Sequence, residues 1–314
     1  MEFDVYGIGN ALVDQVAFVD DDFLIRNDIL KGTMALVGEP ASQSSHAGGP
    51  LDYEKCSGGS AANTIVGLSQ MGGRAAYTGK VAADGNGEFY RSDLKDAGVE
   101  FSSQPGDGHT GVCVSYVTPD GQRSMLTYLG VSSDLARSDI NEDIIKSARY
   151  LYVEGYQWSA EKARDASEFA MELAQRHGTK VAFTYSDPVM AQTYGTDFRR
   201  VTKDLVDLLF CNEIEAMSIT GTDTIEDAID IIKPDVGMVC VTAGSRGALV
   251  AGEEVITETP ALRVDKLVDT TGAGDMYAAG VLRGLTLGFD LVTASMIGSR
   301  MAAIVVSQVG ARLR

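Results

Sequence analysis

Residues 150–183, YLYVEGYQWSAEKARDASEFAMELAQRHGTKVAF, contain the unit that decides the fold. Tyr150–Val153 and Lys180–Phe183 are short and apolar, as buried strands are. Between them, Ala160–His177 has the length and the apolar spacing of an amphipathic helix. A strand, a helix and a second strand in this order indicate parallel strands joined by a helix that packs on the sheet.

The same alternation extends outward from this unit in both directions. Further strands are predicted at Phe3–Gly9, Ala75–Val81, Leu208–Cys211 and Gly237–Thr242, with a hairpin across Gly252–Glu254. Further helices are predicted at Ser60–Met71, Gly87–Ala97, Glu213–Ile219, Ile225–Ile232, near Gly274–Leu285 and at Leu291–Val309. The chain is therefore expected to be an α/β protein with a mostly parallel central sheet covered by helices on both faces. Ligands bind such sheets at the carboxyl ends of the strands.

Two β-rich patches interrupt this alternation and predict a small β-sheet lid. The first contains the strands Val13–Val19 and Thr33–Val37, with a helix at Asp22–Leu30. The second contains Thr110–Thr118 and Gln122–Tyr128, joined by the turn-forming tripeptide Pro119-Asp120-Gly121. We therefore expect a large domain of residues 1–10, 59–109 and 130–314, and a lid of residues 11–58 and 110–129.

Composition excludes several classes of protein. Of the 314 residues, 45% are hydrophobic and 22% charged, which is typical of a globular chain, and the net charge of −18 argues against a nucleic-acid partner. The four cysteines have neither disulfide-framework nor zinc-site spacing, so reduced thiols are expected. No run approaches 18 apolar residues and no basic leader opens the chain, so we expect no membrane partner and a cytoplasmic location.

The strongest chemical signal is Asp269–Asp275, DTTGAGD, before an Ala- and Gly-rich helical run. Consecutive small residues at a helix start let a ligand approach the unpaired amides of the first turn. Those amides and the helix dipole favour negative charge, and Asp275 is placed to accept a proton from a hydroxyl. The pattern suits phosphoryl transfer to an alcohol. The alternative is a glycine-rich helix start with Asp269 as its capping residue.

Three weaker motifs accompany this one. Ser57–Asn63, SGGSAAN, pairs glycines with an amide side chain before a helix, although a tight turn and cap would look the same. Asn212 and Glu215 share a helix face after a buried strand and could hold hydrated Mg²⁺, or simply form a capped helix start. Thr242–Gly247, TAGSRG, is a glycine-rich strand exit that could cover a nucleotide.

Other catalytic signatures are absent from the sequence. Gly79-Lys80 is not part of a P-loop, and Gly7-Ile8-Gly9 lacks the third glycine of a dinucleotide fingerprint. Ser60 and Ser245 each miss one glycine of the G-x-S-x-G elbow, which leaves a serine hydrolase as a remote alternative. The three histidines have no metal-ligand spacing.

Taken in order, the motifs resemble those of the ribokinase-like (PfkB) family of carbohydrate and nucleoside kinases. GGSAAN at Gly58–Asn63 resembles the first signature of that family, NEIE at Asn212–Glu215 its N-x-x-E motif, and Asp269–Asp275 its second signature. Within the family the chain is most similar to adenosine kinase and its bacterial relatives. The segments that carry this closer resemblance are Gly9–Asp14, Val19–Leu24, Thr110–Cys113, Arg123–Met125 and Glu154–Tyr156.

The resemblance implies an ATP- and Mg²⁺-dependent kinase that phosphorylates the primary (5′-type) hydroxyl of a ribofuranosyl substrate, best represented by adenosine or a related nucleoside, with these roles for its residues. Asp275 would be the catalytic base, with the amides of Gly272, Ala273 and Gly274 as the anion hole and Arg123 reaching the transferring phosphate. The acceptor would be bound by Asn10, Asp14, Gly58, Gly59 and Asn63. ATP would be bound by Asn212, Thr242, Gly244 and Ser299, and Mg²⁺ by Asn212 and Glu215 through water.

Two departures from the family pattern bear on cofactor and substrate. Members activated by potassium carry a serine near the C-terminus, where this chain has an arginine in Gly310–Arg314, which counts against a monovalent-cation site. Thr33–Val37 is apolar where adenosine kinases present a polar residue to the base, so a ribokinase- or fructokinase-like sugar kinase stays open beside a nucleoside kinase. A non-catalytic sensor is a remote alternative. A monomer and a homodimer paired through the lid are both compatible with the resemblance.

Overall fold

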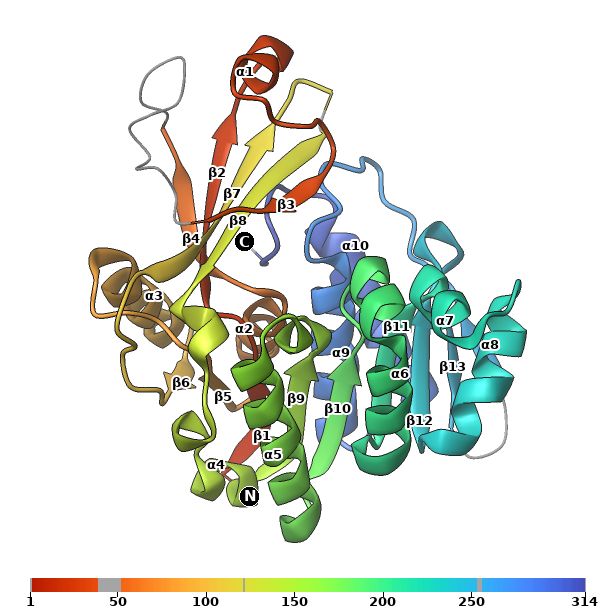
Figure 1. The fold of residues 1–314 in the computed structure, drawn as a ribbon. Coiled ribbons are helices and arrows are strands. Elements are labelled where there is room, and N and C mark those ends of the chain that lie inside the picture. The colour runs from red at the N-terminus through yellow and green to blue at the C-terminus, as the bar shows by residue number, and fades with distance from the viewer. Residues whose placement is uncertain (1, 39–51, 121, 253–255, 314) are drawn as a thin grey trace.

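The computed structural model describes residues 2–38, 52–120, 122–252 and 256–313, and within them a nine-stranded sheet forms the centre of the molecule (Figure 1). The order across this sheet is β14 (Ile256–Thr259), β13 (Ala248–Ala251), β12 (Met238–Thr242), β11 (Leu208–Asn212), β10 (Lys180–Thr184), β9 (Ala148–Glu154), β1 (Phe3–Ile8), β5 (Ala75–Thr78) and β6 (Val99–Phe101). All neighbours from β6 to β12 are parallel, and β12, β13 and β14 are antiparallel. The mostly parallel sheet is thus confirmed; part of the predicted turn at 252–254 lies outside the described residues.

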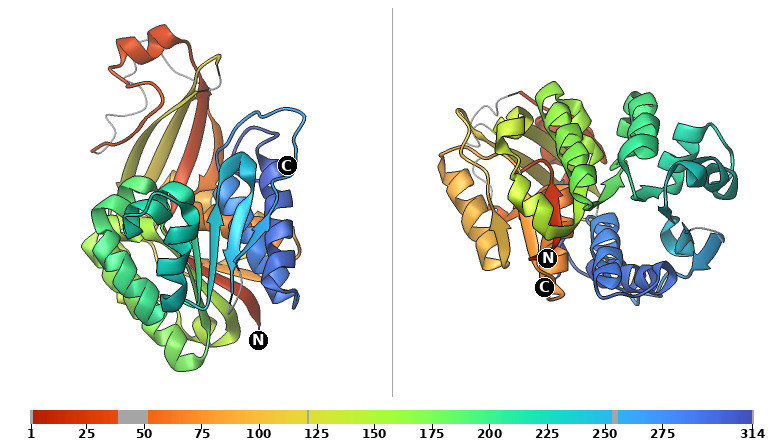
Figure 2. Two further views of the ribbon diagram at one scale, coloured as in Figure 1. Left: turned by 90° about the vertical axis from the view of Figure 1, so that its right-hand side faces the viewer. Right: turned by 90° about the horizontal axis from the view of Figure 1, so that it is seen from below.

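Helices cover both faces of this sheet, as expected (Figure 2). One face carries α4 (Glu142–Ser147), α5 (Glu161–His177), α6 (Pro188–Leu205), α7 (Glu213–Thr220) and α8 (Ile225–Ile232). The other carries α2 (Ser60–Gln70), α3 (Gly85–Asp96), α9 (Ala273–Thr286) and α10 (Leu291–Val305). Each face therefore has its own hydrophobic core, and the sheet is buried between them.

Helix α5 illustrates how the sequence produces this packing. Its buried residues include Ala163, Ala166, Ala170 and Ala174, spaced three or four apart so that they form one stripe. Small side chains along the stripe let the helix lie close to the sheet. The helix ends at Gly178, whose φ of 70° is readily adopted only by glycine.

A second, five-stranded sheet stands above the carboxyl ends of the large-sheet strands (Figure 1). Its order is β3 (Met34–Leu36), β8 (Arg123–Gly130), β7 (Thr110–Val117), β2 (Leu12–Phe18) and β4 (Glu54–Gly58). The predicted hairpin is confirmed by the antiparallel pairing of β7 with β8, although Gly121 of its turn lies outside the described residues. One face of the sheet is covered by α1 (Asp21–Arg26) and a small core of Ala17, Phe23, Leu24, Ile29 and Tyr116. We call this sheet with α1 the lid.

The structure also contains elements that the sequence did not reveal. Helix α6 was not predicted because Pro188 and Gly195 interrupt its pattern, and its backbone is indeed non-helical at Tyr194. Strands β4 and β6 are short and partly polar, and they too escaped prediction. Helix α10 ends at Val305 and not at Val309, so residues 306–313 turn back toward the loop before α9. Among the described helices, none has the length and apolar character needed to cross a bilayer.

Candidate active site

Two aspartates lie at the centre of the candidate site. Around them meet the carboxyl end of β1, the first turns of α2 and α9, and the inner face of the lid. Asp14 lies on β2 of the lid, and Asp275 lies in the first turn of α9. Both are partly exposed, and the negative charge of Asp275 acts on the pKa of Asp14. Residues 261 positions apart in sequence are thus brought to one place, where ligands are expected in an open α/β sheet.

Asp275 is held by two side chains from α2. Ser60 Oγ donates to Asp275 Oδ1 at 2.7 Å, and Asn63 Nδ2 donates to Asp275 Oδ2 at 3.1 Å. Burial raises the pKa of Asp275 to about 6, while these two hydrogen bonds oppose the rise. The carboxylate is therefore still mostly ionised at neutral pH and is more basic than an exposed aspartate, as a general base should be.

The glycine-lined loop before α9 has the geometry of an anion site. Gly272 has a φ of 75° and packs so closely on Ala311 that a Cβ would lie 2.6 Å from it. A Cβ on Gly274, in contrast, would meet no atom within 4 Å. Ala273 N donates to Thr270 O at 3.3 Å within the turn. Apart from this long contact of Ala273, the first-turn amides of a helix have no carbonyl one turn earlier to donate to, so this open side can receive an anion.

Asp14 needs the glycine that ends β4, Gly58, and the Asn10 carbonyl needs the next one, Gly59. A Cβ on Gly58 would lie 2.1 Å from Asp14 Cγ, so any side chain there would displace the carboxyl group. Gly59 has a φ of 101°, and a Cβ there would lie 2.0 Å from the carbonyl oxygen of Asn10. Burial raises the pKa of Asp14 to about 6, although the charges of Arg312 and Arg123 lower it.

Glu154 is a buried carboxyl group that fixes the floor of the site, and the sequence placed it in a segment of resemblance without giving it a role. Glu154 ends β9 and accepts from Asn10 N at 2.7 Å and from Ala61 N at 2.6 Å. Gln157 Nε2 donates to Asn10 Oδ1 at 3.0 Å. Burial raises the pKa of Glu154 to about 7. A charged residue at the end of an apolar strand is the signal that would have identified it.

Arg123 reaches from β8 of the lid to the signature loop. Its side chain donates to Thr271 Oγ1, and its Nη2 lies 3.2 Å from Asp269 Oδ2. Asp269 also accepts from Thr271 N at 3.0 Å and from Gly310 N at 2.9 Å. The guanidinium thus lies beside the glycine-lined loop and supplies a positive charge to Asp269.

Asn212 and Glu215 form a capping box at the start of α7. Glu215 N donates to Asn212 Oδ1 at 2.9 Å, Asn212 N donates to Glu215 Oε2 at 3.0 Å, and Asn212 Nδ2 donates to Glu215 Oε1 at 2.6 Å. Glu215 is buried, which raises its pKa to about 7. The pair is together as expected, but its polar atoms are used within the box. Among the described residues, no three His, Cys, Asp or Glu side chains gather as a metal site.

The remaining predicted nucleotide residues lie farther along the sheet. Thr242 ends β12, and its hydroxyl lies 3.5 Å from the carbonyl oxygen of Cys211. Gly244 has a φ of 55°, and a Cβ on it would meet only open space. Ser299 is buried in α10, next to Gly298, which packs against Tyr277 of α9. Thr242 and Gly244 therefore line a strand exit, whereas Ser299 lies within the helix layer.

One further residue of the site, Arg312, was not predicted. Its guanidinium contacts Asn63 of α2, Ser57 of β4 and Asp93 of α3. Its partners lie more than 200 residues earlier in the chain, so no local motif could have revealed it.

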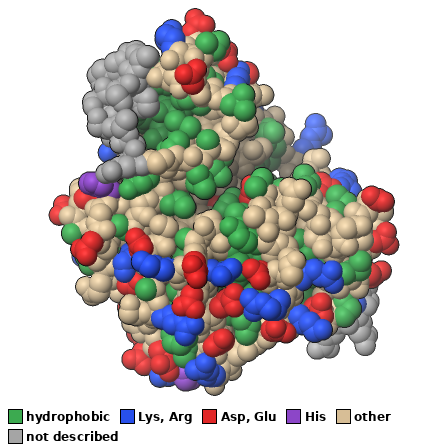
Figure 3. All heavy atoms as spheres, in the orientation of Figure 1, with side chains coloured by type: hydrophobic (Ala, Val, Ile, Leu, Met, Phe, Trp, Pro, Cys, Tyr) green, Lys and Arg blue, Asp and Glu red, His purple; other side chains and the backbone are tan. Residues whose placement is uncertain are grey.

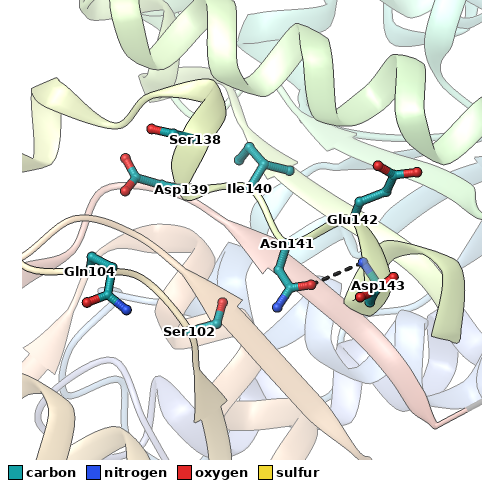
Figure 4. A pocket seen from close by; sticks show the side chains of 8 residues that line it. All are labelled: Ser102, Gln104, Ser138, Asp139, Ile140, Asn141, Glu142 and Asp143. Carbon is teal, nitrogen blue, oxygen red and sulfur yellow. Dashed lines mark hydrogen bonds between the residues drawn. The ribbon is translucent and has the colours of Figure 1, made fainter.

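A separate polar cavity of about 380 Å³ lies apart from these residues (Figure 4). It is lined by Ser102, Gln104, Ser138, Asp139, Ile140, Asn141, Glu142 and Asp143. Within the residues that the structure describes, no histidine serves Ser60 as a base: Ser60 donates to Asp275, while His109 lies near Asp84 and His177 near Glu142. His46 lies outside the described residues.

Comparisons with known proteins agree with this geometry. Residues 42–314 match the family described as pfkB family carbohydrate kinase. The crystal structure of adenosine kinase from Sinorhizobium meliloti superposes with a TM-score of 0.92 and 38% identity, covering 99% of this chain and 96% of that one. The crystal structure of a probable sugar kinase from Rhizobium etli superposes with a TM-score of 0.92 and 36% identity, covering 99% of this chain and 95% of that one. Fructokinase-1 of Oryza sativa is 29% identical over 243 residues, 74% of each chain.

Proposed function

The chain belongs to the pfkB family of carbohydrate kinases, and we propose that it transfers a phosphoryl group from ATP to the primary, 5′-type hydroxyl of a ribofuranosyl substrate, best represented by adenosine or a related nucleoside. The family and the kinases that the chain resembles show that it is a phosphotransferase of the sugar- or nucleoside-kinase type. The observation that carries the proposed transfer to a hydroxyl is Asp275, a carboxylate held by Ser60 and Asn63 at the mouth of a glycine-lined helix.

In the proposed reaction Asp275 accepts the proton of the acceptor hydroxyl as that oxygen attacks the terminal phosphorus of ATP. The bond from that phosphorus to the bridging oxygen breaks, and ADP leaves with the electron pair. The amides of Gly272, Ala273 and Gly274 stabilise the charge on the transferring group, as pre-oriented donors do. Arg123 adds a positive charge from the lid side. The lid excludes water, so the phosphoryl group goes to the acceptor and not to solvent.

The acceptor is proposed to be bound by Asn10, Asp14, Gly58, Gly59 and Asn63, with ATP along Asn212, Thr242 and Gly244. Ser299 is buried in α10, so its contribution to ATP binding would be indirect. Mg²⁺ would be held mainly by the phosphates and water, with Glu215 outside the inner shell because both of its oxygens accept from Asn212. When bound, the ion neutralises phosphate charge.

The lid favours an acceptor that carries an apolar, planar group. Strand register places Leu36, Thr127, Cys113 and Asp14 in one row, so their side chains share a face of the sheet. Met34 and Leu36 are 46% and 59% exposed, and hydrophobic atoms gather on the lid above the rest of the molecule (Figure 3). A nucleobase would cover these side chains, whereas a free hexose is smaller and more polar. The sugar-kinase alternative has support from the probable sugar kinase and the fructokinases.

The decisive experiment is a measurement of ATP consumption with adenosine, inosine, guanosine, ribose and fructose, with and without potassium. We expect turnover with at least one nucleoside at a higher kcat/KM than with either sugar. Turnover with fructose or ribose alone would favour the sugar-kinase alternative. Nucleotide binding without turnover of any acceptor would favour the sensor.

A further inference from the structure

We infer that Arg312 is a positioning residue of the acceptor site, whose guanidinium fixes the side-chain amide of Asn63 and the end of β4 beside Asp14. This inference deepens the proposed function and rests on it for its kinetic consequences. Its structural content, the fixed geometry around Asp14 and Asn63, can be measured without turnover.

The guanidinium joins three elements, α2, α3 and β4, beside the site. Arg312 Nη1 donates to Asp93 Oδ2 of α3 at 2.8 Å, and Nη2 donates to Ser57 Oγ of β4 at 2.7 Å and to the Ser57 carbonyl. Nε donates to Asn63 Oδ1 of α2 at 3.4 Å. The Arg312 side chain is only 13% exposed, so these contacts are poorly screened by water.

The contact with Asn63 decides which way its amide points. Because Arg312 can only donate, the group facing it must be the amide oxygen. The amide nitrogen then faces Asp275 and donates to Oδ2. Without the guanidinium, only Asp275 still orients the Asn63 amide, so the donor to the proposed base is held from one side instead of two.

The contact with Ser57 fixes the chain next to Asp14. Ser57 Oγ donates to Asp93 Oδ2 at 2.5 Å, and Ser57 N donates to the same oxygen at 2.9 Å, so serine, aspartate and arginine form one network. The next residue is Gly58, which packs directly against the carboxyl group of Asp14. A shift at Ser57 therefore moves the surface on which Asp14 rests.

The charge of Arg312 also acts on Asp14. Burial raises the pKa of Asp14, and the positive charge of Arg312 is the largest influence that lowers it. The titratable and charged groups around Asp14 are Arg312, Arg123 of β8, Asp275 of α9, Cys113 of β7, Tyr90 of α3 and Cys56 of β4. Loss of Arg312 leaves Arg123 as the cation among them, so Asp14 should take up a proton at higher pH.

The test compares Arg312→Gln and Arg312→Lys with wild type, and uses Arg137→Gln as the matched control. Arg137 makes a similar two-point contact with Asp165, but both side chains are more than half exposed and lie outside the site. Kinetic constants for acceptor and ATP are measured from pH 5 to pH 9, and the pKa of Asp14 is measured by ¹³C NMR of its carboxyl group.

In Arg312→Gln we expect KM for the acceptor to rise about tenfold or more, with KM for ATP within about twofold of wild type. The Asp14 pKa should rise, the acid limb of kcat/KM should move to higher pH, and Arg312→Lys should recover part of both changes because it keeps the charge. The control should match wild type. An unchanged Asp14 pKa, equal increases in both KM values, or lysine no better than glutamine would overturn the inference.

Two further comparisons keep the result interpretable. If Arg312→Gln does not fold, Asp93→Asn removes one partner of the guanidinium while leaving Arg312 in place, and we expect it to change acceptor KM in the same direction. If wild type consumes no ATP with any acceptor, the proposed function fails, yet the NMR measurement still decides whether Arg312 controls Asp14.

Discussion

The ion pair between Arg123 of the lid and Asp269 of the signature loop gives a prediction that is independent of substrate. The side chains are 12% and 8% exposed, and Nη2 and Oδ2 are 3.2 Å apart. Removing one partner of a buried pair leaves an uncompensated charge, which costs about 3–5 kcal/mol. In Arg123→Met, however, Asp269 keeps the amides of Thr271 and Gly310 as donors. We therefore expect a smaller loss, about 2 kcal/mol in the free energy of unfolding.

In a chain of this size that loss corresponds to a decrease in Tm of about 4 °C, measurable by circular dichroism or differential scanning fluorimetry. The double variant Arg123→Met/Asp269→Asn also removes the unpaired carboxylate, so it should recover part of the decrease. The surface pair Arg137–Asp165 is the control: its side chains are 56% and 52% exposed, and Arg137→Met should change Tm by less than about 1 °C. An unchanged Tm in Arg123→Met, or a double variant less stable than the single one, would refute the reasoning.

Three further predictions concern the reaction itself. Asp275→Asn should lower kcat by about 10²–10⁴-fold while ATP still raises the Tm, because a general base is lost and the nucleotide site is kept; near-normal turnover would contradict the assignment. Activity should decrease as the pH falls through about 6, since Asp14 and Asp275, whose pKa values burial raises to about 6, must be ionised to act; a flat pH profile of activity down to pH 5 would contradict this. A raised pKa also means that folding favours the protonated form of the carboxyl group. Asp275→Asn should therefore raise the Tm at pH 8, where the wild-type carboxylate is charged. Replacing KCl with choline chloride should change the rate by less than about twofold, since Arg123 and two amides already contact Asp269; clear activation by potassium would show that a cation is still needed.

Most of the fold could be predicted from local sequence patterns. The apolar stripe of α5 and the apolar runs of β1, β9 and β10 are repeated signals, and the parallel sheet followed from their alternation. Helix α6 escaped because Pro188, Gly195 and the irregular turn at Tyr194 weaken its local pattern, while tertiary packing on the sheet still stabilises it.

In the candidate site too, residues within short motifs could be predicted, whereas contacts between distant residues could not. Glycines and carboxylates of the motifs could be assigned roles because a short sequence already implies a turn or a helix start, as at Gly59 and Gly272. Contacts across the fold could not be predicted: Glu154 reaches Ala61 over 93 positions, and Arg312 reaches Asn63 over 249. The apolar Thr33–Val37 segment left the acceptor open, and its Met34 and Leu36 side chains lie exposed on the face that carries Asp14.

The packing of α1 on the five-stranded sheet has a consequence for how the lid can move. Phe23 and Leu24 of α1 pack on Ala17 and Tyr116 in an interior of their own, whereas Val13 of β2 and Val112 of β7 pack in one core of the large domain. Only the part of the sheet around α1 can therefore shift without exposing apolar side chains to water, because the starts of β2 and β7 are held in that core. Polar links such as that from Arg123 to Asp269 and Thr271 would then contribute to the barrier to such a shift, and the charge of a bound ligand could change how often they break.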